Sequence, residues 1–164
     1  MIRPCIVYAD HCDEALEFYV SIFPNSKVLS IQRAEADNGP VTKGQVLGAT
    51  FQLDGREYLA FDGGPTFKFT EGFSLMVNCK TQEEVDRYWT KLTQGGGEEG
   101  PCGWLKDKYG LSWQVVPTAL MELLNDPDRA KAQRVMSAML QMGKIEIEPL
   151  RRAYEGEEQR AATT

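Results

Sequence analysis

Few residues in this 164-residue chain have types and spacings that could carry chemistry. The single histidine, His11, stands beside Asp10 at the start of a predicted helix. A Ser-His-Asp triad would need His11 as its base, and a zinc site would need closely spaced ligand pairs. The capping surroundings of a helix explain His11 better than catalysis. The four cysteines include no Cys-x-x-Cys pair, and we expect them to be reduced thiols in a reducing cytoplasm: Cys5, Cys12, Cys79 and Cys102.

The segment 62–69 (DGGPTFKF) combines a carboxylate with aromatic side chains. Asp62 ends a predicted strand before a tight turn, and Phe67 and Phe69 are apolar in a stretch expected to face water. Such aromatics often line a ligand site or a subunit interface, and packing of the loop onto its own domain is an equal alternative. Asp62 could act as a general base only if desolvation raised its pKa toward neutrality.

Two tryptophans, Trp104 and Trp113, stand on the two strands of one predicted hairpin. Their side chains offer large apolar surfaces with one polar atom each, and either could belong to a ligand site or to the core. The neighbouring run 95–100 matches Gly-x-Gly-x-x-Gly. A dinucleotide motif needs a strand before it and a helix after it, whereas here the order is reversed. We interpret the run as a flexible connector.

The first third of the chain predicts a strand, a helix and three more strands. The run 4–9 is apolar, Asp10 is the predicted N-cap, and apolar residues follow at helical spacing until Pro24. The three later strands are expected at 27–33, 45–53 and 57–62. Asp54-Gly55 joins the last two, which is a strong hairpin signal.

The same order repeats in the next part of the chain. A strand is expected at 73–79, and Thr81 with Glu84 forms a capping box for a helix that ends near Gly95. Further strands are expected at 102–106 and 111–117, with a weakly signalled strand near Glu98-Glu99. The chain therefore contains two βαβββ modules. Paired modules can cover one face of their sheets with helices and leave the other face curved and open.

Helices are predicted from Thr118 onward. A short helix covers 120–124, Asp126-Pro127 begins a second that ends at Gly143, and a third covers 146–155. The second helix carries an apolar stripe, which we expect to pack against the domain or a second subunit: Val135, Met136, Met139 and Leu140. The tail, 157–164, is predicted to be disordered.

Charge and hydropathy exclude two classes of partner. The net charge of −6 and the pI near 4.9 argue against nucleic acid, and Lys106 and Lys108 read as solvated charges. No apolar run approaches the roughly 18 residues that a membrane span requires, and no signal-peptide pattern is present. We expect a cytoplasmic protein without a membrane partner.

Several runs together carry a family resemblance. FYVSIFPNS, GGPTFKF, VNCKTQEEVDRYW and GGGEEGPCGWLKDKYGLSWQVVP resemble the PhnB-like family, also labelled 3-demethylubiquinone-9 3-methyltransferase. It belongs to the vicinal-oxygen-chelate superfamily of glyoxalases, bleomycin-resistance proteins and dioxygenases. The resemblance extends from about residue 2 to 156. It implies an α+β fold in which paired βαβββ modules form a cupped mixed sheet, commonly in homodimers.

The implied organisation is one domain, 1–156. Module one covers 1–62, module two covers 73–117, and C-terminal helices cover 118–156. A conventional S-adenosylmethionine enzyme uses a doubly wound α/β domain with a Gly-rich turn after its first strand. The chain has neither the length nor that turn, which argues against a methyltransferase activity.

The enzymes of this superfamily bind a divalent metal through four strand positions. Alignment places them near Pro4, Ala60, Ser74 and Gln114. Pro and Ala offer no ligating side chain, and neutral Ser and Gln are weak ligands. A shift of one residue gives no better set. We therefore expect no metal and no other cofactor.

Strand alternation extends this alignment to whole faces of the sheet. If those four positions face the cup, eight others do so too: Ile6, Tyr8, Tyr58, Asp62, Met76, Asn78, Ser112 and Val116. The opposite face is apolar, as a helix-covered face must be. It carries Cys5, Val7, Leu59, Phe61, Phe73, Leu75, Val77, Leu111, Trp113 and Val115.

The leading functional hypothesis is a metal-independent small-molecule-binding protein. The expected contacts are Tyr8, Asp62, Phe67, Asn78, Trp104 and Gln114, a mixture of apolar area and a few polar groups. The first alternative is an enzyme of the same superfamily, such as a lyase or dioxygenase, that uses Asp62 as general base or a metal bound elsewhere. The second is a partner-binding module that uses Phe67 and Phe69.

Overall fold

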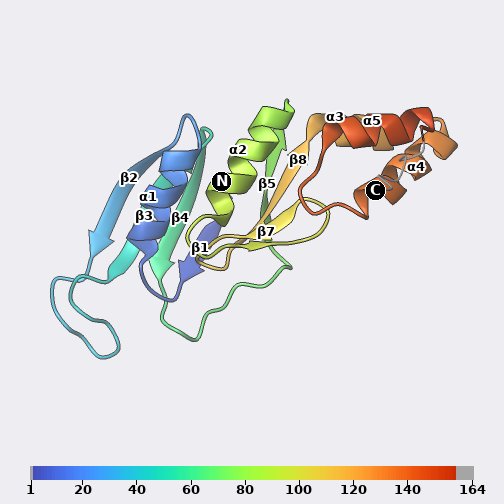
Figure 1. The fold of residues 1–164 in the computed structure, drawn as a ribbon. Coiled ribbons are helices and arrows are strands. Elements are labelled where there is room, and N and C mark those ends of the chain that lie inside the picture. Colours follow the sequence, from blue (N-terminus) through green and yellow to red (C-terminus); the bar gives the residue numbers. More distant parts are fainter. Residues whose placement is uncertain (1, 158–164) are drawn as a thin grey trace. The chain divides into compact units, whose positions relative to one another are not determined.

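The structure, a computed structural model, describes residues 2–157. Its chain divides into two compact units, one ending at Phe69 and the other beginning at Thr70 (Figure 1). The modules predicted at 1–62 and 73–117 lie in different units. The predicted single domain remains a prediction. The tail predicted to be disordered, 157–164, lies outside the described residues except for Glu157.

The first unit contains one helix and a four-stranded mixed sheet. In chain order its elements are β1 (Cys5–Tyr8), α1 (Cys12–Ile22), β2 (Lys27–Arg33), β3 (Val46–Leu53) and β4 (Arg56–Asp62). The strand order is β1-β4-β3-β2, with β1 parallel to β4 and the other pairs antiparallel. Asp54 and Gly55 both have positive φ angles, 46° and 80°, as a two-residue hairpin of this hand requires.

The second unit repeats that arrangement and confirms the predicted duplication. Its elements are β5 (Ser74–Cys79), α2 (Gln82–Thr93), β6 (Glu98–Glu99), β7 (Trp104–Lys106) and β8 (Ser112–Pro117). The strand order is β5-β8-β7-β6, again with one parallel pair. The Thr81 hydroxyl accepts the Glu84 N–H at the start of α2, so the predicted cap is confirmed. The Glu84 carboxylate accepts the N–H of Lys80.

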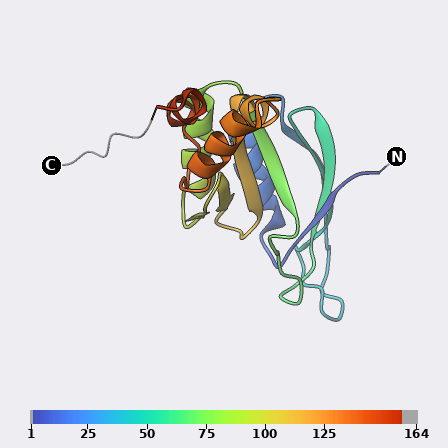
Figure 2. The same ribbon diagram turned by 90° about the vertical axis from the view of Figure 1, so that its right-hand side faces the viewer.

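Three helices complete the second unit: α3 (Thr118–Leu124), α4 (Arg129–Met139) and α5 (Ile147–Glu155) (Figure 2). They share a core formed by Val116, Leu120, Val135, Ile145 and Leu150. Helix α4 begins later than predicted. Asp128 is its N-cap, because its carboxylate accepts the N–H groups of Ala130 and Lys131. The predicted stripe divides: Val135 and Met139 pack inward, whereas Met136 and Leu140 are exposed.

The prediction of the helix-covered face is wrong for the first unit. The Tyr8 hydroxyl donates to the hydroxyl of Tyr19 on α1 at 3.0 Å, and both side chains are buried. Ile6 and Ala60 share the Tyr8 face and are buried too. Every residue of β1 from Cys5 to Tyr8 is apolar, so alternation of polarity did not distinguish the two faces. Helix α1 therefore covers the predicted cup face of β1 and β4.

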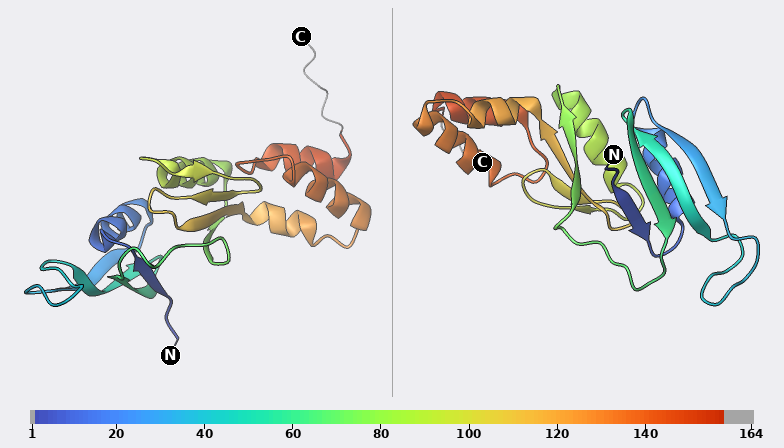
Figure 3. Two further views of the ribbon diagram at one scale, coloured as in Figure 1. Left: turned by 90° about the horizontal axis from the view of Figure 1, so that it is seen from below. Right: turned by 180° about the vertical axis from the view of Figure 1, so that it is seen from behind.

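In the second unit the alternation agrees with the prediction for β8, whereas Phe73, predicted for the helix-covered face, is 50% exposed. Helix α2 lies over one face of the sheet (Figure 3), and the neighbouring Trp113 and Val115 of β8 are buried. Met76 and Asn78 on β5 are exposed, so their face of that strand is not the one under α2. Among the described residues no helix is long and apolar enough to cross a membrane.

Candidate functional site

Strand register arranges the face of the second sheet opposite α2 in rows. The first row contains Ser74 of β5, Ser112 of β8 and Lys106 of β7, and the second contains Met76, Gln114 and Trp104 in the same strand order. Partners in register point to the same face of a sheet. We call these six side chains the open face. Asn78 and Val116 form the next row along β5 and β8.

The Ser112 hydroxyl is the unusual atom of the open face. Ser112 is 1% exposed, and its Oγ has no hydrogen-bond partner among the described residues. A buried polar group without a partner costs about 1–3 kcal/mol, and native proteins contain few of them. A polar atom of a ligand on this face would remove that cost.

A cation stands beside Ser112 in the same row. Lys106 Nζ lies 2.6 Å from a carboxylate oxygen of Glu71, which belongs to the loop before β5. This hydrogen-bonded pairing raises the pKa of Lys106 and lowers the pKa of Glu71. Both side chains are exposed to solvent. The ion pair therefore links the loop before β5 to β7, whose Lys106 lies next to Ser112 in register.

The second row offers apolar area around one amide. Gln114 Nε2 donates to Ser74 Oγ at 3.0 Å, which orients the amide across the two strands. Trp104 is half-buried on one side of Gln114, and Met76 is 51% exposed on the other. Apolar side chains with a few oriented polar groups are typical of small-molecule sites.

Three of the six predicted contact residues lie together on this sheet. Trp104 and Gln114 belong to the open face, and Asn78 is one row away from Gln114. Pairing with Gln114 settles the face of Trp104, which the sequence left open. Ligand contact by these residues remains a prediction.

Sequence reasoning placed Ser112 on this face but did not include it among the contact residues. It interpreted Lys106 as a solvated charge. The spacing in the sequence could have identified Lys106. It follows Trp104 by two residues, so strand alternation puts both side chains on one face.

Tyr8 and Phe67 lie in the first unit and have different surroundings. The Tyr8 ring meets Phe69 edge to face, with the ring centres 5.3 Å apart, and its hydroxyl bonds to Tyr19. Phe67 is 52% exposed in the loop after β4. Tyr8 therefore belongs to the core under α1, and Phe67 to the surface of a loop.

Asp62 is held by backbone amides at both carboxylate oxygens. Its Oδ1 accepts the Cys12 N–H at 2.8 Å, and its Oδ2 accepts the Val46 N–H at 3.0 Å. Helix α1 has His11 as its N-cap, in the left-handed region at φ 56° and without a side-chain cap. The predicted N-cap at Asp10 is therefore wrong, and Asp62 supplies the acceptor from β4. This arrangement suits an anchor between elements.

A cleft of about 410 Å³ lies beside Asp62 in the first unit. Several of its charged groups pair with one another. His11 lies 3.3 Å from Glu14 and 3.6 Å from Asp10, and Arg33 lies 2.6 Å from Asp13. The lining still has an excess of negative charge, because the carboxylates of Asp10, Asp13, Glu14 and Asp62 face only the Arg33 guanidinium and the His11 imidazole.

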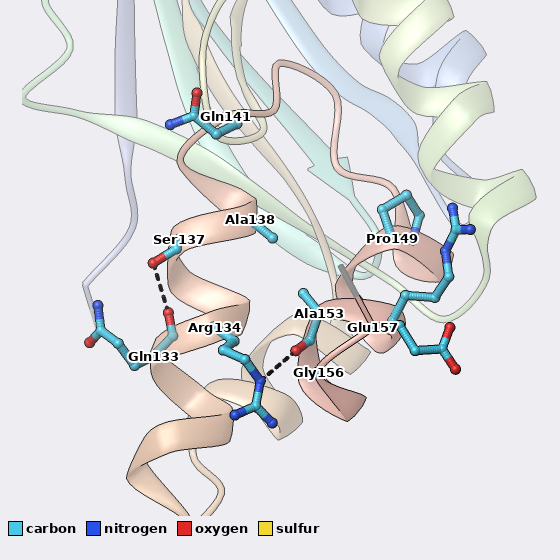
Figure 4. A pocket seen from close by; sticks show the side chains of 10 residues that line it. Gln133, Arg134, Ser137, Ala138, Gln141, Pro149, Ala153, Gly156 and Glu157 are labelled. Carbon is cyan, nitrogen blue, oxygen red and sulfur yellow. Dashed lines mark hydrogen bonds between the residues drawn. The ribbon is translucent and has the colours of Figure 1, made fainter. Parts of the chain in front are cut away.

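A groove of about 390 Å³ lies between α4 and α5 (Figure 4). Arg134 points across it, donating Nε to the Ala153 carbonyl at 2.8 Å and Nη2 to the Tyr154 carbonyl at 2.6 Å. Ser137 donates to the Gln133 carbonyl within α4. The guanidinium therefore caps the last turn of α5, and these polar groups serve the helices.

The positions aligned with the superfamily's metal ligands do not fit a divalent ion. Ala60 is buried and Pro4 is exposed, and neither carries a donor. Ser74 and Gln114 are neutral and bond to each other. Within residues 2–157 no group of three or more His, Cys, Asp or Glu side chains is placed to hold a metal ion.

Comparison with known proteins gives one family match. The model of the family described as 3-demethylubiquinone-9 3-methyltransferase matches residues 1–116. That range includes the whole open face and ends before α3. No curated protein matches the chain significantly.

Solved structures resemble the chain over about seven-tenths of its length. A putative 3-demethylubiquinone-9 3-methyltransferase, the PhnB protein from Bacillus cereus, is 37% identical with a TM-score of 0.64, covering 71% of this chain and 98% of that one. Protein PA1353 from Pseudomonas aeruginosa is 18% identical, with a TM-score of 0.60 and coverage of 71% and 96%. The fosfomycin resistance protein FosX from Listeria monocytogenes is 17% identical, with a TM-score of 0.52 and coverage of 74% and 95%. The last two show likeness of fold alone.

Proposed function

The chain belongs to the 3-demethylubiquinone-9 3-methyltransferase family, and we propose that it binds a small molecule on the open face of its second sheet without a divalent metal. The observation that carries this proposal is the buried Ser112 hydroxyl that lacks a partner among the described residues. A ligand acceptor or donor at Ser112 would complete its hydrogen bonding. Trp104 and Met76 would supply apolar contact area, with Gln114 and Asn78 as further polar contacts.

The family's description names a methyltransferase, and the fold gives that activity no support. Each sheet contains one parallel pair of strands among antiparallel ones. A doubly wound parallel sheet would present a Gly-rich turn and a helix N-terminus to the cofactor. Neither four-stranded sheet has that topology.

We propose further that the protein forms a homodimer and resides in a reducing cytoplasm. The four cysteines are free thiols, which is consistent with that compartment. The exposed Phe67 is the side chain we propose for the subunit contact.

Replacement of Ser112 by alanine tests the proposed site. Because Ser112→Ala removes an unpartnered buried hydroxyl, the variant should unfold at the same denaturant concentration as the parent protein or at a higher one. Compounds that raise the melting temperature of the parent in a small-molecule screen should bind the variant about tenfold more weakly. Ser137→Ala, an exposed serine on α4, is the matched control.

The proposal fails if Ser112→Ala and Trp104→Ala both leave the affinity of every such compound unchanged. It also fails if no compound in a chemically diverse screen stabilises the parent protein. Stability measured on the same samples separates loss of binding from loss of fold.

A further inference from the structure

We propose that the open face selects planar aromatic acids, with the carboxylate at Ser112 and Lys106 and the rings over Trp104 and Met76. This inference rests on the proposed function of the open face and specifies its ligand class. It also assigns Glu71 a role, as an internal carboxylate that the ligand replaces.

The position of the acid follows from the first row. Lys106 already binds a carboxylate, that of Glu71, at 2.6 Å. An ion pair this exposed contributes little to stability, so replacement of Glu71 costs little. The Ser112 hydroxyl, next to Lys106 in register, has no partner while Glu71 occupies the ammonium. Ser112 is 1% exposed, so a ligand carboxylate reaches both groups only if the side chains around this row move aside as Glu71 is displaced. It then gains a hydrogen bond that Glu71 does not make.

The position of the rings follows from the second row. Rows on one face are two residues apart, which is about 7 Å along a strand. Trp104 lies that far from Lys106 along β7, and Gln114 lies that far from Ser112 along β8; Met76 flanks Gln114 on β5. Planar rings pack well against an indole and a thioether. A carboxylate joined to two fused rings, as in 2-naphthoate, has the length to occupy both rows.

The amide between the rows favours a flat ligand over a branched one. The Gln114 side chain is held to Ser74 at 3.0 Å and therefore lies across the strands. A flat ring can pass over a side chain in this orientation, whereas a branched aliphatic acid would meet it.

Isothermal titration calorimetry with 2-naphthoate and its neutral isostere 2-naphthamide tests the inference on the full chain. The parent protein should bind the acid at least tenfold more tightly than the amide. Lys106→Met should abolish that preference, because both ligands then lack a cationic partner. Lys91→Met, an exposed lysine on α2, changes the net charge equally and should preserve the preference.

Glu71→Gln tests the replacement step separately. Removal of the competing carboxylate should raise the affinity for 2-naphthoate severalfold while leaving that for 2-naphthamide unchanged. Equal affinity for both compounds in this variant would contradict the role of Glu71.

The possible failures separate the two proposals. If the amide binds the parent as tightly as the acid, or if Lys106→Met keeps the preference, the aromatic-acid class is wrong while the open face remains a binding surface. If neither compound binds, the inference is also wrong. In that case the Ser112→Ala and Trp104→Ala screen decides whether the proposed function fails with it.

Discussion

The Asp62 carboxylate takes the place of the N-cap side chain that helix α1 lacks. Its two oxygens bond to the backbone of α1 and of β3. Asn in place of Asp would present an NH₂ group to one of these N–H donors. We expect Asp62→Asn to lower the free energy of unfolding by about 1–3 kcal/mol, measured by urea denaturation.

Asp10→Asn is the control for that substitution, because Asp10 is an exposed aspartate just before α1. Unchanged stability of Asp62→Asn combined with loss of ligand binding would contradict the anchoring role. It would restore Asp62 as a site residue.

Two of the cysteines, Cys12 and Cys79, are buried and have weakly acidic thiols. Burial raises the pKa of Cys12 and of Cys79 to about 12, and neighbouring carboxylates add to the effect. At pH 8 on the order of 10⁻⁴ of such thiols is ionised, and the thiolate is the reactive form. In native protein, iodoacetamide should therefore modify the exposed Cys5 well before these two, as followed by peptide mass spectrometry. Rapid native labelling of Cys12 would contradict this expectation.

At the scale of elements, local signals predicted most of the fold. The Asp54-Gly55 hairpin, the Thr81 cap and the repeated βαβββ order depend on residues close together in sequence, and the structure confirms them. The start of α1 could not be predicted in the same way. Its acceptor comes from Asp62, 50 residues after the Cys12 N–H that it binds.

The candidate site, too, was predictable from the sequence only where the signal is local. Alternation placed Gln114 and Ser112 on one face because these two polar residues alternate with the apolar Trp113 and Val115 in β8. In β1 both faces are apolar, so the pattern did not indicate which one packs under α1. The pairing of Lys106 with Glu71 needed tertiary structure, because a loop brings the two side chains together.

Helix α2 is tied to the segment before α5 by two polar side chains. Gln82 Nε2 donates to the Ile145 carbonyl at 3.1 Å, and its Oε1 accepts the Ile147 N–H at 2.8 Å. Asp86 accepts from Lys144 Nζ at 2.5 Å. These bonds connect the sheet-covering helix to the core of the C-terminal helices.

The Asp86 tie predicts a pH dependence of stability. The hydrogen bonds from Lys144 and then Gln82 hold the pKa of Asp86 below its usual value of 3.8. Because the pKa of Asp86 is lower in the folded state than in the unfolded state, the ionised carboxylate stabilises the fold above pH 3.8. This stabilisation is lost as the pH falls through the pKa that Asp86 has in the folded protein. Urea denaturation between pH 7 and pH 3 should therefore show a larger loss of stability for the parent than for Asp86→Asn. Glu17→Gln, an exposed carboxylate on α1, should behave like the parent.

At the scale of the whole molecule, the family match and the C-terminal helices are distinct parts of the chain. The family match ends at residue 116. The similarity to the Bacillus cereus protein covers 98% of that protein but only 71% of this chain. The helices α3–α5 have a core of their own, to which the sheet contributes Val116. Residues of the open face lie inside the matched part, so we expect the proposed ligand site to belong to the family rather than to the added helices.

The proposed homodimer gives the last prediction. Phe67 is 52% exposed, whereas its neighbour Phe69 packs on the Tyr8 ring of the same unit. An exposed aromatic on a loop loses water-accessible apolar surface only if something covers it, and we propose that a second copy does so. Phe67→Asp should therefore shift sedimentation equilibrium toward monomer by tenfold or more in dissociation constant. Thr66→Asp adds the same charge in the same loop without removing apolar area, so it should remain dimeric. Equal dissociation of both variants would indicate that the added charge, not the lost aromatic ring, weakens the dimer. A parent protein that is monomeric at micromolar concentration would refute the proposed subunit contact at Phe67.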